Sequence, residues 1–137
     1  MHDERDAREL VAAADADRKL MDIEQYRCYI EAALAYSYGT HTYEDVARMV
    51  QEGSLQFWPG VASVILTEII EHPRRRVLNV FLAGGKLDEI ERMIPPLQDW
   101  ARSRGCTLAV FAGRQGWERT FLAKDGWTPR VWMAKEI

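Results

Sequence analysis

Apolar residues recur at helical spacing in the first part of the chain, behind a charged N-terminal stretch. Residues Asp3 to Lys19 mix acids, arginines and alanines around a thin apolar stripe. This pattern predicts a helix that is either loosely attached or binds a partner protein. The stripe is stronger from Asp22 to Tyr38, which predicts a second helix that ends at Gly39.

A third helix is predicted after a short loop. Thr42 and Asp45 have the spacing of a capping box, with Asp in place of the usual Glu. Val46 and Val50 continue the apolar stripe, and Gly53 is placed to end the helix.

The pattern changes from helix to strand after this point. Leu55 to Trp58 predicts a short strand, and the branched residues from Val61 to Glu71 predict a longer one. A turn at His72 to Arg74 leads into a third strand, Arg75 to Ala83. Because the connection is short, we expect the second and third strands to be antiparallel.

The third strand is apolar on both sides, which predicts a central strand covered on both faces. Strict alternation assigns its side chains to one face (Leu78, Val80 and Leu82) and to the other (Val77, Asn79 and Phe81).

Helix and strand alternate in the remainder of the chain. Leu87 to Arg104 predicts a helix that the two prolines at positions 95 and 96 should kink or split. Thr107 to Ala112 predicts a strand, Trp117 to Lys124 a short helix, and Trp127 to Glu136 a last strand. The element order predicts an α/β (α+β) fold with a helical N-terminal segment.

Composition bounds the class of protein. The 137 residues suit a single domain over 1–137, in which 1–20 is the loosely attached part. A net charge of -3 argues against a nucleic-acid-binding module, and no apolar run is long enough to span a membrane. The N-terminus lacks the order of a signal peptide, so we expect a cytoplasmic protein.

The cysteines and the one basic cluster have simple interpretations. Cys28 and Cys106 are far apart in a chain without an export signal, so both are expected to be small core residues. Arg74, Arg75 and Arg76 are expected in a solvated turn, and phosphate binding is the alternative.

The stretch from Val77 to Lys86, VLNVFLAGGK, offers the clearest chemistry. An apolar strand stops at two glycines and passes at once into a helix. Such a junction puts free backbone N–H groups at the helix start, which suits an anion such as a pyrophosphate.

With this junction and with Phe121 to Trp127 (FLAKDGW), the chain resembles the GNAT superfamily of N-acetyltransferases. The resemblance covers roughly Ser54 to Ile137. The resemblance implies a GNAT-like mixed, mostly antiparallel sheet flanked by helices, and acetyl-CoA as cofactor. It also implies that the pyrophosphate is held at Leu82, Ala83, Gly84, Gly85 and Lys86. The sequence segments GTHTYEDV, LQFWPG and GWER are similar to those of small GNAT-like proteins of tailed phages and prophages.

The chain departs from that family at the residues that would do chemistry. The phosphate loop is reduced to Gly84 and Gly85, and Leu122 stands where many members have a tyrosine that acts as an acid. Glu68, in ILTEIIE, is the candidate general base. Its alternatives are an exposed strand face or a pair with an arginine. His41 lies in a second polar group, which helix capping explains equally well.

Two functions of different kinds remain open on the sequence. The first is an acyltransferase that moves an acetyl group from acetyl-CoA to an amine. The second is a non-catalytic GNAT-like structural protein, whose N-terminal helix docks on a virion or host protein. A generic α/β domain is a third interpretation, since fold does not imply function.

Overall fold

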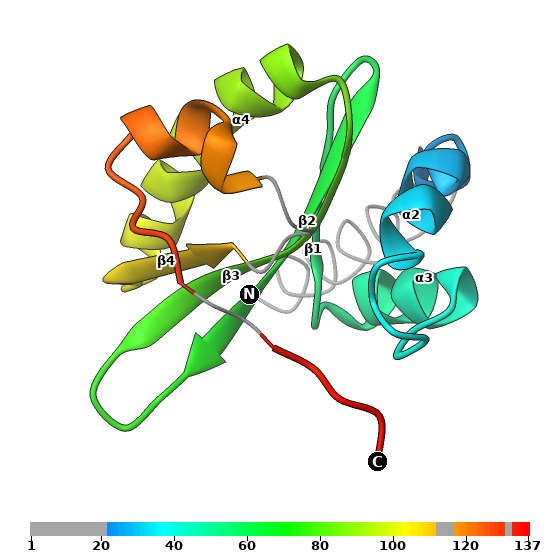
Figure 1. Cartoon of the computed structure of the whole chain (residues 1–137), viewed down its shortest axis with the longest axis horizontal. Coiled ribbons are helices and arrows are strands. Elements are labelled where there is room, and N and C mark those ends of the chain that lie inside the picture. The colour runs from blue at the N-terminus through cyan, green and yellow to red at the C-terminus, as the bar shows by residue number, and fades with distance from the viewer. Residues whose placement is uncertain (1–21, 112–116, 131–132) are drawn as a thin grey trace, which may run out of the picture.

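The computed structural model describes residues 22–111, 117–130 and 133–137, and the helix predicted at 3–19 lies outside them. Its helices and strands are arranged around one sheet (Figure 1). In chain order the elements are α2 (Arg27–Leu34), α3 (Tyr43–Glu52), β1 (Gln56–Pro59), β2 (Ser63–Glu71), β3 (Arg76–Gly85), α4 (Leu87–Ser103), β4 (Leu108–Phe111), and the 3₁₀ turns η1 (Trp117–Arg119) and η2 (Phe121–Lys124).

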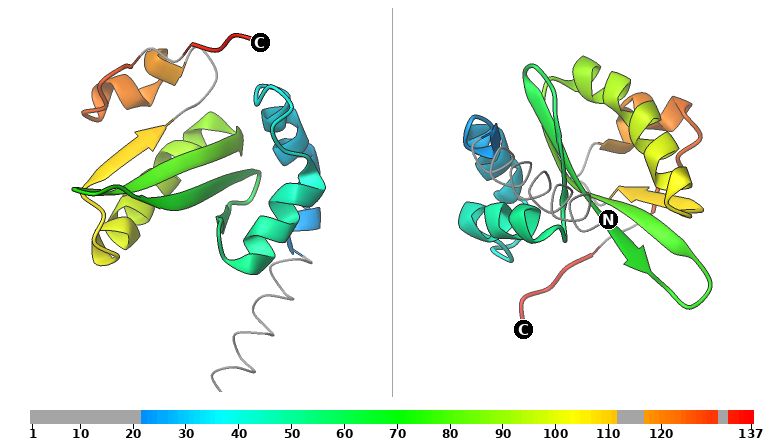
Figure 2. Two further views of the ribbon diagram at one scale, coloured as in Figure 1. Left: turned by 90° about the horizontal axis from the view of Figure 1, so that it is seen from below. Right: turned by 180° about the vertical axis from the view of Figure 1, so that it is seen from behind.

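The described strands form one sheet in the order β1-β2-β3-β4. β1, β2 and β3 pair antiparallel, whereas β4 runs parallel to β3 because α4 forms the crossover between them. α2 and α3 cover one face and α4 covers the other (Figure 2). The predicted mixed, mostly antiparallel sheet flanked by helices is therefore confirmed.

Apolar side chains fill both faces of the sheet. The core on the α2–α3 face includes Ile30, Val46, Val64, Leu66 and Leu82. The core on the α4 face includes Ile65, Leu78, Val80, Ile90 and Leu97. The central strand β3 is thus covered on both faces, as its apolar sequence predicts.

A β-bulge interrupts the alternation of side chains along β3. Consecutive residues of β2 pair with Leu82 and Val80, so Phe81 between them has no partner in β2. Leu82 consequently packs in the α2–α3 core, while Leu78 and Val80 pack against α4. The prediction that Leu78, Val80 and Leu82 share one face is wrong, because strict alternation cannot anticipate an extra residue.

The predicted start and end of α3 are confirmed. Asp45 N donates to Thr42 Oγ1 at 3.2 Å, and Thr42 N donates to Asp45 Oδ2 at 2.9 Å, which completes the capping box. Gly53 ends the helix with φ +85°. The second predicted helix is shorter than expected at both ends. A turn at 25–26 separates residues 22–24 from α2, and α2 ends at Leu34 rather than at Gly39.

α4 runs without a break through Pro95 and Pro96, so the pair does not split it. Both prolines are exposed, while Ile94 and Leu97 beside them are buried against the sheet. Each proline removes one backbone hydrogen bond from the helix interior. Burial of the neighbouring apolar side chains holds the helix together across that loss.

The last predicted strand does not form in the described residues 127–130 and 133–137, and β4 stays at the edge of the sheet. Trp127 instead packs against Phe111 with ring centroids 6.4 Å apart, and its backbone N–H donates to the Leu122 carbonyl at 3.3 Å. Pro129 cannot donate to a strand ladder, which disfavours pairing here.

The two cysteines have different environments. Cys106 is buried, as predicted, and burial raises the pKa of its thiol. Cys28 is exposed, so its predicted core role is wrong; α2 turns Ile30 and Leu34 to the core instead. None of the helices in the described ranges is long and apolar enough to cross a membrane.

Candidate functional site

Strand β3 extends well beyond its neighbour β4. Within the described residues, β4 pairs with Val77–Val80, whereas β3 continues to Gly85. In the part of the chain that the structure describes, residues 81–85 have no strand partner on this edge. An unpaired strand edge presents backbone N–H and C=O groups that a ligand can bind.

A cavity of about 570 Å³ opens beside this edge, a volume typical of small-molecule sites. The C-terminal segment passes in front of the sheet toward the α2 side (Figures 1 and 2). The lining comes from the sheet (Asn79 and Phe81 to Gly85), from α2 and the loop after it (Tyr29, Ala32, Ala33, Leu34, Tyr36, Ser37, Tyr38 and Thr40), and from the C-terminal part (Phe111, Trp117, Ala134, Lys135 and Glu136).

The bulged residue Phe81 lies where β3 parts from β4. It follows Val80, the last residue paired with β4, and has a register partner in neither neighbouring strand of the described sheet. Its ring packs edge-on against His41, with centroids 4.9 Å apart. Sequence reasoning missed the bulge, because apolar residues occupy both faces of this strand and no break in the pattern marks the extra residue.

The predicted cofactor segment forms one wall of the cavity. Leu82, Ala83, Gly84 and Gly85 all line it, and exposed Lys86 follows as the N-cap of α4. A Cβ atom at Gly84 would lie 2.8 Å from the backbone oxygen of Tyr29. Glycine at this position therefore lets α2 approach the strand closely and close that side of the cavity.

β3 and α4 meet without an intervening loop. The strand ends at Gly85, and the N–H of Lys86 donates to the Ala62 carbonyl at 3.2 Å. Asp88 and Glu89 occupy the first turn of α4. Acidic side chains at this position stabilise the positive end of the helix dipole.

Glu89 bonds to the turn between β1 and β2. Its carboxylate accepts hydrogen bonds from the N–H groups of Val61 and Ala62, both at 2.9 Å, and from the Ser63 hydroxyl. The Ser63 hydroxyl, followed by the Ala62 and Val61 amides, holds the pKa of Glu89 below its ordinary value. An internal carboxylate thus lies at the start of the helix.

Glu68 does not line the cavity itself but contacts Asn79, which does. It is half-buried on β2, and its Oε1 accepts a hydrogen bond from Asn79 Nδ2 at 2.8 Å. Asn79 itself lines the cavity. The structure therefore gives Glu68 an amide partner at the edge of the site.

Tyrosines reach the cavity from the N-terminal side. Leu122, at which the resemblance noted in the sequence would place a tyrosine, is buried and carries no proton donor. Tyr29, Tyr36 and Tyr38 line the cavity from α2 and the loop after it. Sequence reasoning missed them because the family pattern places its tyrosine late in the chain. Their signal is the density of tyrosines in the second predicted helix.

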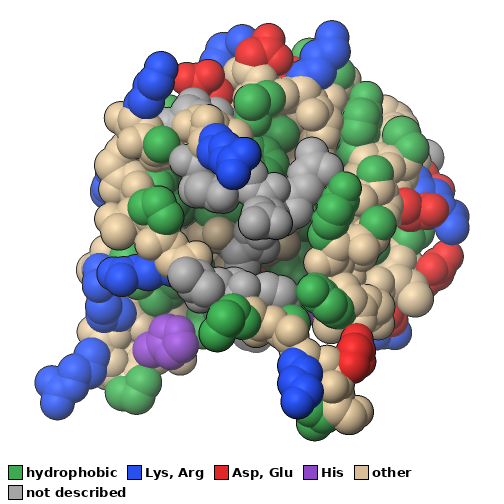
Figure 3. Space-filling view, viewed as in Figure 1, with side chains coloured by type: hydrophobic (Ala, Val, Ile, Leu, Met, Phe, Trp, Pro, Cys, Tyr) green, Lys and Arg blue, Asp and Glu red, His purple; other side chains and the backbone are tan. Residues whose placement is uncertain are grey.

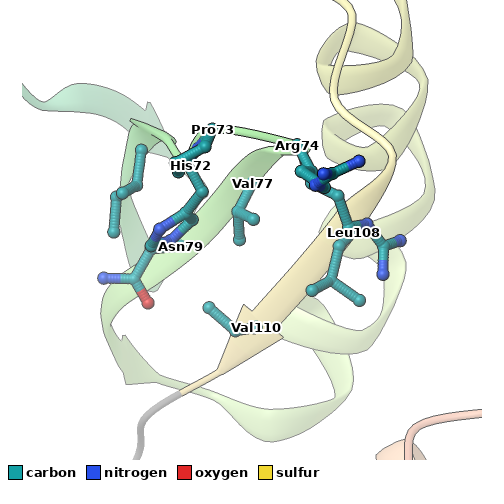
Figure 4. Close-up of a pocket in the computed structure, with 9 residues that line it drawn as sticks. His72, Pro73, Arg74, Val77, Asn79, Leu108 and Val110 are labelled. Atoms are coloured by element: carbon teal, nitrogen blue, oxygen red, sulfur yellow. The ribbon is translucent and has the colours of Figure 1, made fainter.

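A second hollow, of about 620 Å³, lies under the β2–β3 hairpin. Figure 4 shows Val77 and Val110 between His72 on one side and Arg74 on the other. Lys and Arg side chains gather at this end of the molecule, at lower left in Figure 3.

The arginine cluster is exposed, as a solvated turn predicts, but two of its members also bind backbone. Arg75 Nη2 donates to the Thr107 carbonyl at 2.6 Å, and Arg76 Nη1 donates to the Arg104 carbonyl at 2.5 Å. These contacts tie the hairpin to the connection between α4 and β4.

Comparison with known proteins identifies the fold. No family model matches the chain, and no curated protein matches its sequence significantly. Among solved structures it is similar to the ribosomal-protein-alanine N-acetyltransferase of Brucella melitensis biovar Abortus 2308, with TM-score 0.58, 14% identity, and coverage of 86% of this chain and 94% of that one.

Two other solved structures have a similar fold. An acetyltransferase of Trypanosoma brucei has TM-score 0.53 and 15% identity over 69% of this chain and 76% of that one. The protein TTHA1254 of Thermus thermophilus has TM-score 0.53 and 11% identity over 72% of this chain and 83% of that one. The chain has a GNAT-like fold. At these identities the likeness shows the fold alone.

Proposed function

We propose that this protein is an N-acetyltransferase that moves an acetyl group from acetyl-CoA to an amine. The observation that carries the proposal is the bulged edge of β3 at Phe81, which has no partner among the described strands and opens into the cavity. The fold likeness to proteins named as acetyltransferases supports it.

Leu82, Ala83, Gly84 and Gly85, which line the cavity, are the residues that would hold the donor. Acetyl-CoA would supply an acyl group activated as a thioester. In this proposal the Phe81 backbone N–H, at the bulge where β3 has no register partner in β2, would donate to the carbonyl oxygen that gains negative charge, as in an oxyanion hole. The cavity walls orient the two reactants, which lowers the entropic part of the barrier.

Proton transfer needs a base and an acid at this site. As the new C–N bond forms and the C–S bond breaks, the amine loses a proton and the sulfur leaves as a thiolate that is protonated. We assign the first task to Glu68, whose carboxylate accepts a hydrogen bond from Asn79 at the cavity wall and would take the proton through a bridging water. The second falls to a tyrosine of the α2 side, because Leu122 cannot donate a proton.

Titration with acetyl-CoA tests binding. A ligand that binds only the native state at a hundredfold excess over Kd stabilises it by about 2.7 kcal/mol. We therefore expect a rise in Tm and measurable heat in calorimetry. Ala32→Trp, at an exposed position lining the cavity, should abolish both by filling the site.

Gln51→Trp is the matched control, because position 51 is exposed on α3 outside the cavity lining. It should leave binding unchanged. Release of free thiol with a panel of amines then tests turnover. An unchanged Tm at millimolar acetyl-CoA would overturn the proposed function.

A second candidate is a non-catalytic GNAT-like protein, encoded by a phage and docked on a virion or host protein through its N-terminal segment. The buried Leu122 and the loop-free β3–α4 junction favour it. It predicts no affinity for acetyl-CoA and co-purification with virion proteins from an induced lysate. A well-defined acetyl-CoA site together with amine-dependent thiol release would contradict it.

A further inference from the structure

Two polar groups of the junction between β3 and α4 already have partners within the protein. The Lys86 N–H is bonded to Ala62, and Glu89 binds the β1–β2 turn through three hydrogen bonds. A helix start binds a phosphate when its N–H groups are open and no other anion is near. Here a carboxylate with a lowered pKa, and therefore charged at neutral pH, already lies there.

The charges around the junction also disfavour a diphosphate. Asp88 is exposed beside Glu89, and its ion-pair partner is Arg92, whose Nη1 lies 3.8 Å from Asp88 Oδ2. Lys86 is the single positive charge between Gly85 and Glu89. A diphosphate placed at this helix start would meet the Glu89 carboxylate, the Asp88 carboxylate with its Arg92 partner, and the Lys86 ammonium group.

The cavity itself is nearly neutral. Among its lining residues that the structure describes, the charged side chains are Lys135 and Glu136, one of each sign. The rest of the wall is aromatic, aliphatic, uncharged polar or backbone, next to the unpaired edge of β3. Such a wall suits an amide-containing, uncharged chain, whose N–H and C=O groups can pair with the strand edge.

We propose that this protein recognises its acyl donor through the pantetheine arm and the acyl group, and that the nucleotide diphosphate contributes nothing at the β3–α4 junction. The inference rests on the proposed function, which it deepens by naming the donor class. Any S-acyl pantetheine thioester is a donor for this site, with or without the nucleotide.

Calorimetry with three ligands tests the inference on the whole chain. Acetyl-CoA and S-acetyl-pantetheine should bind with Kd values within about threefold of each other, because the diphosphate adds no charge-assisted hydrogen bonds. Adenosine 3′,5′-diphosphate should not bind. The Kd of acetyl-CoA should change little with salt, because no ion pair with the diphosphate is screened.

Two variants sharpen the test at exposed positions. Lys86→Ala and Asp88→Asn should both leave the Kd of acetyl-CoA unchanged. The inference is overturned if acetyl-CoA binds at least about tenfold more tightly than S-acetyl-pantetheine and Lys86→Ala removes that advantage. If neither thioester binds, both the inference and the proposed function fail. Tight binding of acetyl-CoA alone would overturn the inference and leave the proposed function standing.

Discussion

The side chain of Glu89 connects α4 to the turn between β1 and β2 through hydrogen bonds. Its pKa is lowered mainly by the Ser63 hydroxyl and further by the Ala62 and Val61 amides. A carboxyl group whose pKa is lower in the folded state than its ordinary value of 4.5 stabilises the fold at pH values above 4.5. That contribution is lost as the pH falls through the lower pKa of the folded state.

Glu89→Gln should therefore lower Tm at neutral pH, because an amide oxygen accepts these hydrogen bonds more weakly than a carboxylate. The difference from the wild type should shrink as the pH falls below 4.5, where the wild-type carboxyl becomes protonated and resembles the amide. Thermal denaturation across this pH range measures the effect. Glu91→Gln, at an exposed position of the same helix, is the control. A difference that stays constant with pH would contradict the account.

Glu68 gives a second prediction at the scale of single residues. Glu68→Gln keeps an oxygen that can accept from Asn79, so Tm should hardly change. If Glu68 is the base, kcat should fall by about 10²–10⁴-fold while KM is preserved. Glu71→Gln, at the exposed end of the same strand, should leave kcat unchanged. Unchanged turnover in Glu68→Gln would assign the base elsewhere.

Residues whose partners are close in sequence could be predicted, and those with distant partners could not. Thr42 and Asp45 lie three positions apart, and their spacing alone predicts the capping box. Glu89 binds groups 26 to 28 positions away, so its role depends on the folded arrangement of α4. The prediction for Cys28 is wrong because a helix pattern indicates periodicity better than it indicates which face is buried.

α4 carries the clearest prediction at the scale of elements. Pro95 and Pro96 are exposed in the helix interior, where each removes a hydrogen bond and costs up to about 3 kcal/mol. Replacing both with Ala should raise Tm by roughly 4 °C for each kcal/mol recovered. Differential scanning calorimetry measures it. Pro73→Ala, in the hairpin turn, is the control and should not raise Tm. A fall in Tm of the double variant would show that the prolines fit this helix without cost.

Strands and turns were predicted well where the signal is local. The β2–β3 hairpin follows from its short connection, and the structure confirms its antiparallel pairing. The bulge at Phe81 and the missing strand in the described C-terminal residues were not predicted. The first inserts a residue into a regular alternation, and the second depends on whether β4 finds a partner, which a local pattern does not encode.

The whole molecule brings together three distant parts of the chain at one cavity. Tyr29 from α2, Phe81 from β3 and Trp117 from η1 all line it. The sequence predicts the strand that runs into Gly84 and Gly85, since that is a local signal, and the expected pyrophosphate role of this segment stays a prediction. It could not predict the facing walls, because these depend on how α2 and the C-terminal part pack around the sheet.

The central claim is that the β4-facing edge of β3 from Phe81 to Gly85, which has no strand partner among the described residues, holds an acyl thioester. A titration of isotope-labelled protein with acetyl-CoA, followed by backbone amide NMR, tests it most directly. The account predicts that the largest shifts fall on Phe81, Leu82 and Ala83, with smaller ones at Phe111 on β4. Saturable binding that leaves these amides unmoved, or no binding at millimolar ligand, would contradict it.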